Sequence, residues 1–352
     1  AGFSVAQLGP RKAAVLDGDP PADQRAGKPA AAQNECAGGW VDVIGKKTGL
    51  ALVMRWFSQL YPDEMELSAG GDLTCHFWSP RFAHLMDLRP KPWLTARGNY
   101  EIWHSQNVPF IQQSKRMHQL PVEDGGTMDA DGAGVAKTHE FALILHDPAQ
   151  ESLVAEQALA IQDPIYAYAE PAWTTATEVF QKSLPAGDPS FKDVNAALDR
   201  YTRRFIADQR DDKIINDQAY GPSLGIFDFG DDLHATKYCH RYYTGHFYCA
   251  PTMPWCLYFR SGERNARRLA EANSRHRMDV DMCHFTEDPA SGRRAGAWSD
   301  DDSGIIHWSA YGCPLETTSN YAPHLAWMYY LTGDERAYDV ALEVAEALKW
   351  SA

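Results

Sequence analysis

The pattern of apolar and polar residues changes near residue 150. Before that point, short apolar runs rich in β-branched and aromatic residues are separated by turns that contain Gly and Pro, as at 50–57, 72–78 and 141–146. Such runs are typical of antiparallel strands. After it, apolar residues recur three and four positions apart, a spacing that lines one face of a helix, as at Val194, Leu198, Tyr201 and Phe205.

A short segment near the C-terminal end occurs twice. Residues 257–263 and 328–334 each hold an aromatic pair followed by Gly and an acidic residue, and Gly262 and Gly333 lie 71 positions apart (333 − 262). Gly suits the left-handed position that ends a helix, and an acidic residue suits the start of the next helix. The repeat predicts stacked helical hairpins, as in a superhelix or an α/α toroid.

The chain is therefore expected to be an α+β multidomain protein. We predict an antiparallel β-sandwich over 40–150 and an α/α-toroid domain over 151–352, which the sequence covers only in part. Residues 1–39 are rich in Ala, Pro, Gly and Asp and poor in large apolar residues, so we expect a loop-like segment or the remnant of an upstream domain. The whole chain is interpreted as a fragment or a processed product.

Charge and hydropathy narrow the classes of partner. The formal net charge of −14 leaves no basic stripe for nucleic acid. No apolar run approaches the length of a membrane span. We therefore expect neither a nucleic-acid nor a membrane partner, and an extracellular or periplasmic location rather than a cytoplasmic one. The seven cysteines form no CxxC pair, which favours buried thiols, with one or two disulfides among the last five as an alternative.

The densest group of reactive side chains lies within residues 231–246. If this segment were helical, residues three and four apart would share a face and offer cations and phenols together. The candidate catalytic residues are His234, Lys237, Tyr238, Arg241, Tyr242 and His246. The alternative for any single residue is packing or solvation.

A second group, within residues 300–324, combines aromatic rings with His and Asn. Aromatic faces stack on sugars and polar side chains hold hydroxyl groups. The candidate substrate-binding residues are His307, Trp308, Tyr311, Asn320 and Tyr321. Here too, core packing is the alternative for each ring.

A third group, Asp279, Asp281 and His284, contains ligand types for a divalent cation, the candidate cofactor. Without a fourth ligand in view, salt bridges or capping at a helix end are the favoured interpretation. Phosphate-binding Gly loops and HExxH are absent from the sequence, which argues against nucleotide and zincin chemistry.

Several short motifs together resemble the exo-rhamnogalacturonan lyase family. These motifs are residues 134–141, 78–80 followed by 86–89, 278–281 with His284, and 331–334. The resemblance implies an N-terminal RIFT-type barrel, a central β-sandwich and a C-terminal α/α toroid, of which this sequence shows the last two. It also implies a lyase that acts by β-elimination on a polysaccharide containing uronic acid.

Elimination requires a cation to offset the uronate carboxylate, a base for the C5 proton and an acid for the leaving oxygen. Arg241 and Lys237 are the candidate cations, and His234 or His246 the candidate base. Tyr238, Tyr242 or Tyr243 is the candidate for the acid or for the base. Lys137, His139 and Glu140, just before a predicted strand, are expected to be mainly architectural.

Two alternatives stay open. A toroid glycoside hydrolase would need two carboxylates beside the scissile bond, which Asp231, Asp232, Asp300 or Asp301 could supply. A carbohydrate-binding protein without catalysis is the other alternative.

Overall fold

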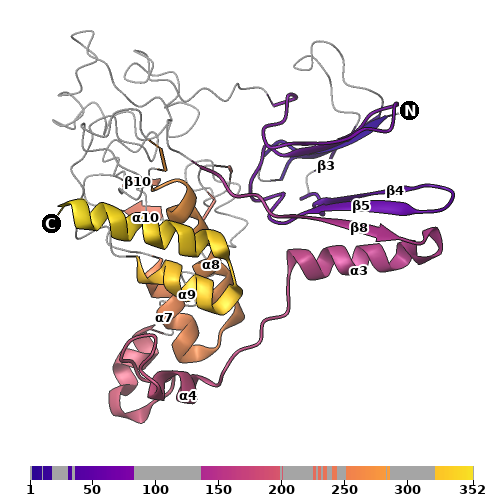
Figure 1. Cartoon of the computed structure of the whole chain (residues 1–352). Helices are drawn as coiled ribbons and strands as arrows, with labels where there is room; N and C mark the ends of the chain where they lie inside the picture. Colours follow the sequence, from indigo (N-terminus) through magenta and orange to yellow (C-terminus); the bar gives the residue numbers. More distant parts are fainter. Residues whose placement is uncertain are drawn as a thin grey trace, which may run out of the picture. The chain divides into compact units, whose positions relative to one another are not determined.

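The computed structural model describes residues 2–9, 11–17, 31–33, 36–82, 136–198, 200, 225–226, 229–230, 233–235, 240–243, 251–282, 284–285 and 322–351. The fold is α+β, as predicted, with antiparallel sheets followed by helical hairpins (Figure 1). The chain divides into two compact units. The first comprises Ala1–Asp87, Thr138–Ala167 and Leu224–Phe227, and the second comprises Leu88–Lys137, Tyr168–Ser223 and Asp228–Ala352. The domain bounds 40–150 and 151–352 stay predictions.

One sheet of the first unit has the strand order β3-β2-β1-β6-β7, with antiparallel pairing throughout. Its strands are β1 (Phe3–Gln7), β2 (Ala13–Asp17), β3 (Ala31–Gln33), β6 (Glu64–Leu67) and β7 (Leu73–His76). Residues 3–7, 13–17 and 31–33 are therefore strands where a loop-like segment was expected, while the alternative, a remnant of an upstream domain, stays a prediction. The reason is visible in β2, where Ala13, Ala14 and Leu16 are buried although two of the three are small.

The second sheet contains β4 (Trp40–Ile44), β5 (Gly49–Met54) and β8 (Phe141–His146) in the order β4-β5-β8, again antiparallel. Val41, Leu52 and Met54 of this sheet share one apolar core with Met65 of the first sheet. A core shared by two antiparallel sheets is the arrangement of a β-sandwich.

Helix α3 (Glu151–Gln162) follows the one-turn helix η5 (Pro148–Gln150) and packs along the β4-β5-β8 sheet, as Figure 1 shows. Its Val154 and Ala158 are fully buried. At its end, Gln162 Nε2 donates to Met54 O at 2.5 Å and its Oε1 accepts from Trp56 N at 3.1 Å. The helix is thus joined to the end of β5.

The second unit is built mainly from helices. They are α4 (Pro171–Ala176), η6 (Pro189–Phe191), α7 (Thr252–Ser261), α8 (Arg264–Asp279), α9 (Pro323–Thr332) and α10 (Glu335–Ser351), with a small hairpin of β9 (Leu233–Ala235) and β10 (His240–Tyr243). An aromatic core that includes Trp255, Phe259 and Trp327 joins the two helical hairpins α7–α8 and α9–α10. None of the described helices is both long and apolar enough to cross a membrane.

The predicted repeat is confirmed in its hydrogen bonds. Gly262 and Gly333 have φ of 71° and 73°, and each N–H donates to the carbonyl four residues earlier at 2.8 Å. The preceding hydroxyls of Ser261 and Thr332 each donate to a helix carbonyl at 2.6 Å. The two hairpins therefore end their first helices in the same way.

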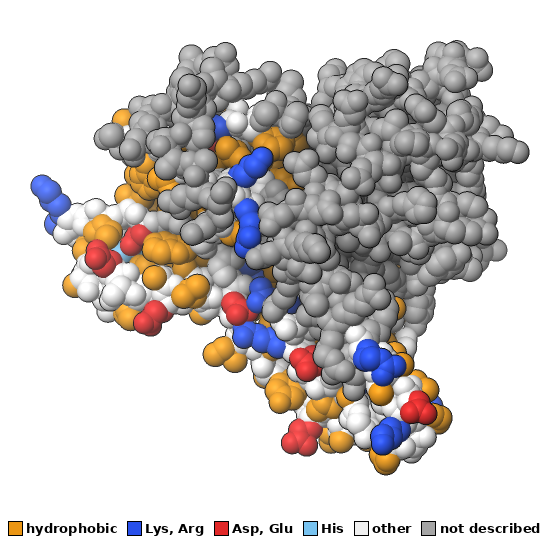
Figure 2. Space-filling model, turned by 180° about the vertical axis from the view of Figure 1, so that it is seen from behind, with side chains coloured by type: hydrophobic (Ala, Val, Ile, Leu, Met, Phe, Trp, Pro, Cys, Tyr) orange, Lys and Arg blue, Asp and Glu red, His pale blue; other side chains and the backbone are white. Residues whose placement is uncertain are grey.

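The described surface also carries apolar side chains. On β8, Phe141, Leu143 and Leu145 are 59%, 62% and 75% exposed. On the face in Figure 2, hydrophobic side chains are interspersed with acidic and basic ones over the described part.

Candidate functional site

The first group of candidates was placed on one face of a helix within residues 231–246, but the described part of this segment forms two strands. His234 lies on β9, while Arg241 and Tyr242 lie on β10. Residues three apart point to opposite faces of a strand, and His234 and Arg241 lie on two different strands, so the helical face expected to hold them together does not form. The backbone instead pairs Tyr242 with His234 across the hairpin, with an irregularity in register at Arg241. The spacing was misleading because Tyr and His are compatible with strands as well.

The remaining candidates of both groups cannot be placed. Lys237, Tyr238 and His246, and all five candidate substrate-binding residues, lie outside the described residues. Their roles therefore stay predictions. The substrate-binding set is His307, Trp308, Tyr311, Asn320 and Tyr321.

The entry to the β9–β10 hairpin rests directly on helix α8. Gly230 has φ of 90°, and a Cβ at this position would lie 2.1 Å from Ala272 O and 3.2 Å from Asn273 N. Only glycine allows so close an approach. The hairpin that carries His234 and Tyr242 thus begins three residues from a contact with the middle of α8.

Beyond this contact, α8 and the residues after it carry a run of buried polar side chains. We call it the α8 polar run: Asn273, His276, Arg277, Asp279 and Asp281, each fully buried. Burying charges is costly unless they are paired. The run is therefore the strongest departure from ordinary packing among the described residues of the second unit.

Ion pairs connect the α8 polar run internally and to residues 136–137. Lys137 Nζ lies 3.8 Å from Asp279 Oδ2, and Ala136 N donates to Asp279 O at 3.1 Å. His276 Nε2 lies 3.3 Å from Asp281 Oδ1, and Arg277 Nη1 lies 3.8 Å from Asp281 Oδ2. Two carboxylates thus hold an ammonium, an imidazole and a guanidinium in one buried region.

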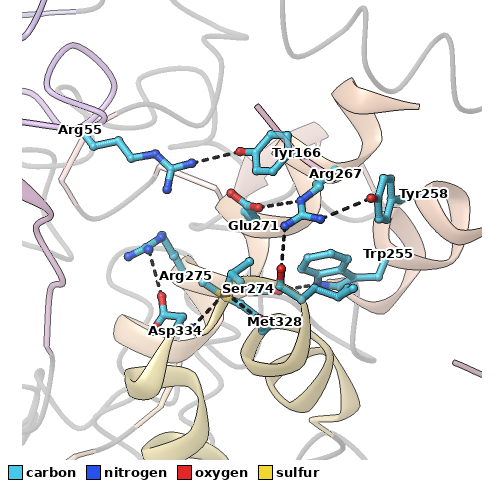
Figure 3. A network of polar contacts seen from close by, with 12 residues as sticks. Arg55, Tyr166, Trp255, Tyr258, Arg267, Glu271, Ser274, Arg275, Met328 and Asp334 are labelled. Atoms are coloured by element: carbon cyan, nitrogen blue, oxygen red, sulfur yellow. Dashed lines mark hydrogen bonds and ion pairs between the residues drawn. The ribbon is translucent and has the colours of Figure 1, made fainter. Parts of the chain in front are cut away.

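The earlier part of α8 is used for packing between hairpins, as Figure 3 shows for its labelled side chains. Arg267 contacts Glu271 at 3.0 Å, the Tyr258 hydroxyl at 3.3 Å and the Leu331 carbonyl at 3.1 Å. The Trp255 indole donates to Ser274 Oγ at 2.9 Å. These contacts connect α8 with both neighbouring helices, α7 and α9.

The third group, Asp279, Asp281 and His284, forms salt bridges. His284 Nδ1 lies 2.7 Å from Glu343 Oε2, and its Nε2 donates to Met278 O at 2.7 Å. Asp279 and Asp281 face Lys137 and the His276–Arg277 pair instead of His284. Within the described residues, no three His, Cys, Asp or Glu side chains are grouped to hold a metal ion.

His284 also affects the pKa of the Glu343 carboxyl. Burial raises the pKa of the Glu343 carboxyl, but the contact with His284 and the charges of His284 and Arg336 outweigh it. The net effect is a pKa below the usual range. Glu343 of α10 therefore forms the acidic side of a cluster with Arg336 of the same helix and His284.

His139 and Glu140 make contacts within the first unit that fit an architectural role. Glu140 accepts from Arg55 Nη1 at 3.1 Å. His139 stacks on Phe77 with ring centroids 4.1 Å apart, and its Nδ1 is 4.0 Å from Asp63 Oδ2. Of the three residues expected to be architectural, Lys137 is the one that lies close to α8, through Asp279.

Sequence reasoning considered Asp279 and Asp281 but overlooked His276, Arg277 and Lys137 as a group with them. A usable signal was present in the repeat. Shifted by 71 positions, His276 and Arg277 correspond to Ala347 and Leu348. Polar residues in one copy of a repeat, where the other copy is apolar, mark a position that packing alone does not require.

Comparison with known proteins places the chain in a family. The family model for the PcRGLX-like protein C-terminal alpha/alpha toroid domain matches residues 168–350. The uncharacterized protein YetA of Bacillus subtilis (strain 168) is 27% identical over 322 residues, which cover 86% of this chain and 32% of YetA. The chain thus spans about a third of the length of this relative. Because the family match extends over more than half of its residues, the chain belongs to the PcRGLX-like family, which is related to rhamnogalacturonan lyases, and carries its C-terminal α/α toroid domain.

Proposed function

We propose that this protein is a polysaccharide lyase that cleaves a rhamnogalacturonan-like polysaccharide by β-elimination next to a uronic acid. The observation that carries the proposal is the match of residues 168–350 to the toroid domain of a lyase-related family. A family relation alone does not define chemistry. The residues around α8 and the hairpin on it add support, because they include the group types that elimination needs.

In β-elimination, a base removes the C5 proton of the uronate, the C4–O bond breaks and a C4–C5 double bond forms. The leaving oxygen takes up a proton and becomes a hydroxyl. The C5 proton becomes acidic only when the charge of the neighbouring carboxylate is offset. A lyase therefore needs a cation at the carboxylate and proton-transfer groups at C5 and O4.

The hairpin candidates supply these types under the proposal. Arg241 and Lys237 offset the carboxylate, His234 or His246 takes the C5 proton, and a tyrosine, Tyr238 or Tyr242, protonates the leaving oxygen. The pairing of Tyr242 with His234 across β9 and β10 brings an acid type and a base type to one register position. His307, Trp308, Tyr311, Asn320 and Tyr321 would hold the sugar.

The product distinguishes the proposal from its alternatives. We expect the purified protein, given rhamnogalacturonan oligosaccharides, to release a C4–C5 unsaturated uronate, measured by its ultraviolet absorbance. Cleavage without that absorbance would replace elimination by hydrolysis, and binding without any cleavage would indicate a carbohydrate-binding protein.

Two substitutions test the assigned roles. Arg241→Ala should lower turnover on the order of a hundredfold, because the charge that develops next to C5 loses its cation. Tyr242→Phe should lower kcat with little change in KM, as for a group that acts mainly in the transition state. Lys349→Ala, at a side chain that is 71% exposed on α10, is the matched control and should leave turnover unchanged.

A further inference from the structure

The apolar face that β5 buries in the core of the first unit continues onto β8, where it is exposed. Leu52 of β5 is 3% exposed and lies directly opposite Leu143 of β8, which is 62% exposed. Met54 is 1% exposed and lies opposite Phe141, which is 59% exposed. Leu145 is 75% exposed. Directly opposite residues of antiparallel strands share a face, so the core ends at β5 and leaves three large apolar side chains of β8 uncovered.

The backbone of β8 is open on one side as well. β8 is the last strand in the order β4-β5-β8, and within the described part of the chain no strand pairs with its outer edge (Figure 1). Edge strands usually carry a bulge, a proline or a charged side chain that prevents pairing with another chain. The sequence of β8, FALILH, contains no proline, lysine or acidic residue, and its register with β5 is regular. β8 therefore lacks the usual protection against pairing.

We infer that β8 is the interface of a homodimer, in which the β8 strands of two copies pair antiparallel about a two-fold axis. In such an interface the same surface serves on both sides, so it must be complementary to itself. Pairing would extend each sheet into one continuous sheet in the order β4-β5-β8-β8-β5-β4. It would also place the exposed apolar row of one copy beside that of its partner, as a continuation of the core that holds Leu52 and Met54.

Self-complementarity selects one register. With Leu143 on the axis, it faces the partner's Leu143, and Phe141 faces the partner's Leu145. All three exposed apolar side chains of each copy then lie opposite an apolar side chain. A shift by one residue would move one apolar row to the other face of the sheet. A shift by two residues in either direction would place one of the three opposite a polar residue, Asp147 or His139.

The charges near the ends of β8 fit the same register. Glu140, directly before the strand, lies opposite the partner's His146, and the two-fold axis repeats this pair at the other end. The Glu140 side chain is 35% exposed, and the hydrogen bond with Asp42 raises the pKa of His146 and so favours its cationic form. Opposite charges across a strand pair are favourable, whereas like charges are destabilising. A second copy of β8 thus matches both the apolar row and the ends of the strand.

The association state tests the interface. Light scattering coupled to size-exclusion chromatography should show a dimer of the wild type at micromolar concentration. Leu143→Glu should weaken the dimer by about thirtyfold or more, the effect of losing a central apolar contact, because two carboxylates would also meet on the axis. Ile44→Glu is the matched control, since Ile44 is 49% exposed on β4, the other edge of the same sheet. It should leave the dimer unchanged.

Cysteine substitutions test the register. Leu143→Cys should link two copies by a disulfide under mild oxidation, because directly opposite Cα atoms lie about 4.5–5.5 Å apart, within the range that a disulfide spans. Leu145→Cys is on the same face and is more exposed, but it lies opposite Phe141 and should not form the link. The wild type, which has seven cysteines of its own, reports any background linkage on the same non-reducing gel.

Opposite results would overturn the inference. A monomeric wild type would exclude the homodimer, and a dimer that withstands Leu143→Glu would be held together by another surface. Equal linkage of the two cysteine variants would refute the register. If Leu143→Glu unfolds, Leu143→Thr replaces it, since Thr is a good strand former and removes most of the apolar contact. A dimer as tight as the wild type in this variant would then refute the interface.

The interface does not depend on the proposed function, and the two can fail separately. A dimer that is weakened by Leu143→Glu, in a protein that forms no unsaturated product, would support the interface and refute the lyase. A monomer that forms the unsaturated product would support the lyase and refute the interface.

Discussion

His146 illustrates how one residue joins two strands and a turn. It ends β8 directly opposite Gly49 of β5, and a Cβ on Gly49 would lie 2.2 Å from the imidazole ring. Its Nε2 lies 2.9 Å from Asp42 Oδ1 on β4, and its Nδ1 is 3.0 Å from Asp147 O. The side chain thus crosses the central strand of a three-stranded sheet, and glycine provides the space.

This geometry predicts a pH-dependent contribution to the stability of the first unit. The hydrogen bond with Asp42, helped by the Asp147 carbonyl, raises the pKa of His146. A pKa raised on folding favours the folded state below the unfolded pKa, and the contribution is lost as pH rises through the folded pKa. We expect Asp42→Asn to lower the urea midpoint at about pH 5.5 and to have a smaller effect at about pH 8.5.

Gly49→Ala is the second arm of this experiment. The new methyl group must displace the imidazole, so the variant should lose the same pH dependence as Asp42→Asn. A wild-type midpoint that rises with pH in this range, or a Gly49→Ala variant that keeps the wild-type profile, would contradict the role assigned to His146.

At the scale of elements, the matched helix ends allow a quantitative comparison. Gly262 and Gly333 have nearly the same left-handed φ, but their surroundings differ. A Cβ on Gly333 would meet nothing within 4 Å, whereas on Gly262 it would lie 3.2 Å from the Tyr168 ring. Backbone strain is therefore common to both positions, and steric crowding is specific to Gly262.

We predict that Gly333→Ala costs about 1 kcal/mol of unfolding free energy, the usual cost of a left-handed non-glycine residue. Gly262→Ala should cost more, because Tyr168 must also move. Urea denaturation of the two variants measures the difference. Gly333→Asn is the control and should cost less than Gly333→Ala, since Asn tolerates this conformation. Equal costs at the two glycines would show that the Tyr168 contact is not restrictive.

The same elements show which parts of the fold can be predicted from the sequence alone. The capped hairpins were predictable because Gly, the aromatic pair and the acidic residue act locally, within one helix end. Strand β2 was missed because its buried face is made of alanines, and its stability comes from pairing with distant β1. The β9–β10 hairpin was misassigned for a related reason, since spacing within 231–246 fits a helix and a strand alike.

The candidate site was harder to predict than the elements. The type of each side chain in residues 273–281 was evident, but the contact with Lys137 joins positions more than a hundred residues apart. No local pattern encodes such a pair. The comparison of α8 with α10, by contrast, needed only the repeat that the sequence already contained.

At the scale of the whole molecule, each unit contains a titratable group whose pKa is shifted, and the two shifts have opposite signs. In the first unit, the raised pKa of His146 favours folding at low pH. In the second unit, the lowered pKa of Glu343 favours folding at high pH. Each unit should therefore show its own pH profile, although both belong to one chain.

Hydrogen–deuterium exchange, corrected for the intrinsic pH dependence of exchange, can follow the two units separately. Contact with His284 and Arg336 lowers the pKa of Glu343 despite its partial burial. That contribution to stability is present above the unfolded pKa and is lost as pH falls through the folded pKa. On lowering the pH from about 5.5 to about 3.5, protection of α10 amides should decrease, by at most about 1 kcal/mol because the cluster is partly exposed.

Glu343→Gln should reduce this decrease in α10 while β8 keeps the wild-type profile, and Asp42→Asn should change the profile of β8 while α10 keeps its own. If either substitution altered both elements equally, one common unfolding event would govern the chain and the separate titration of the two units would be refuted.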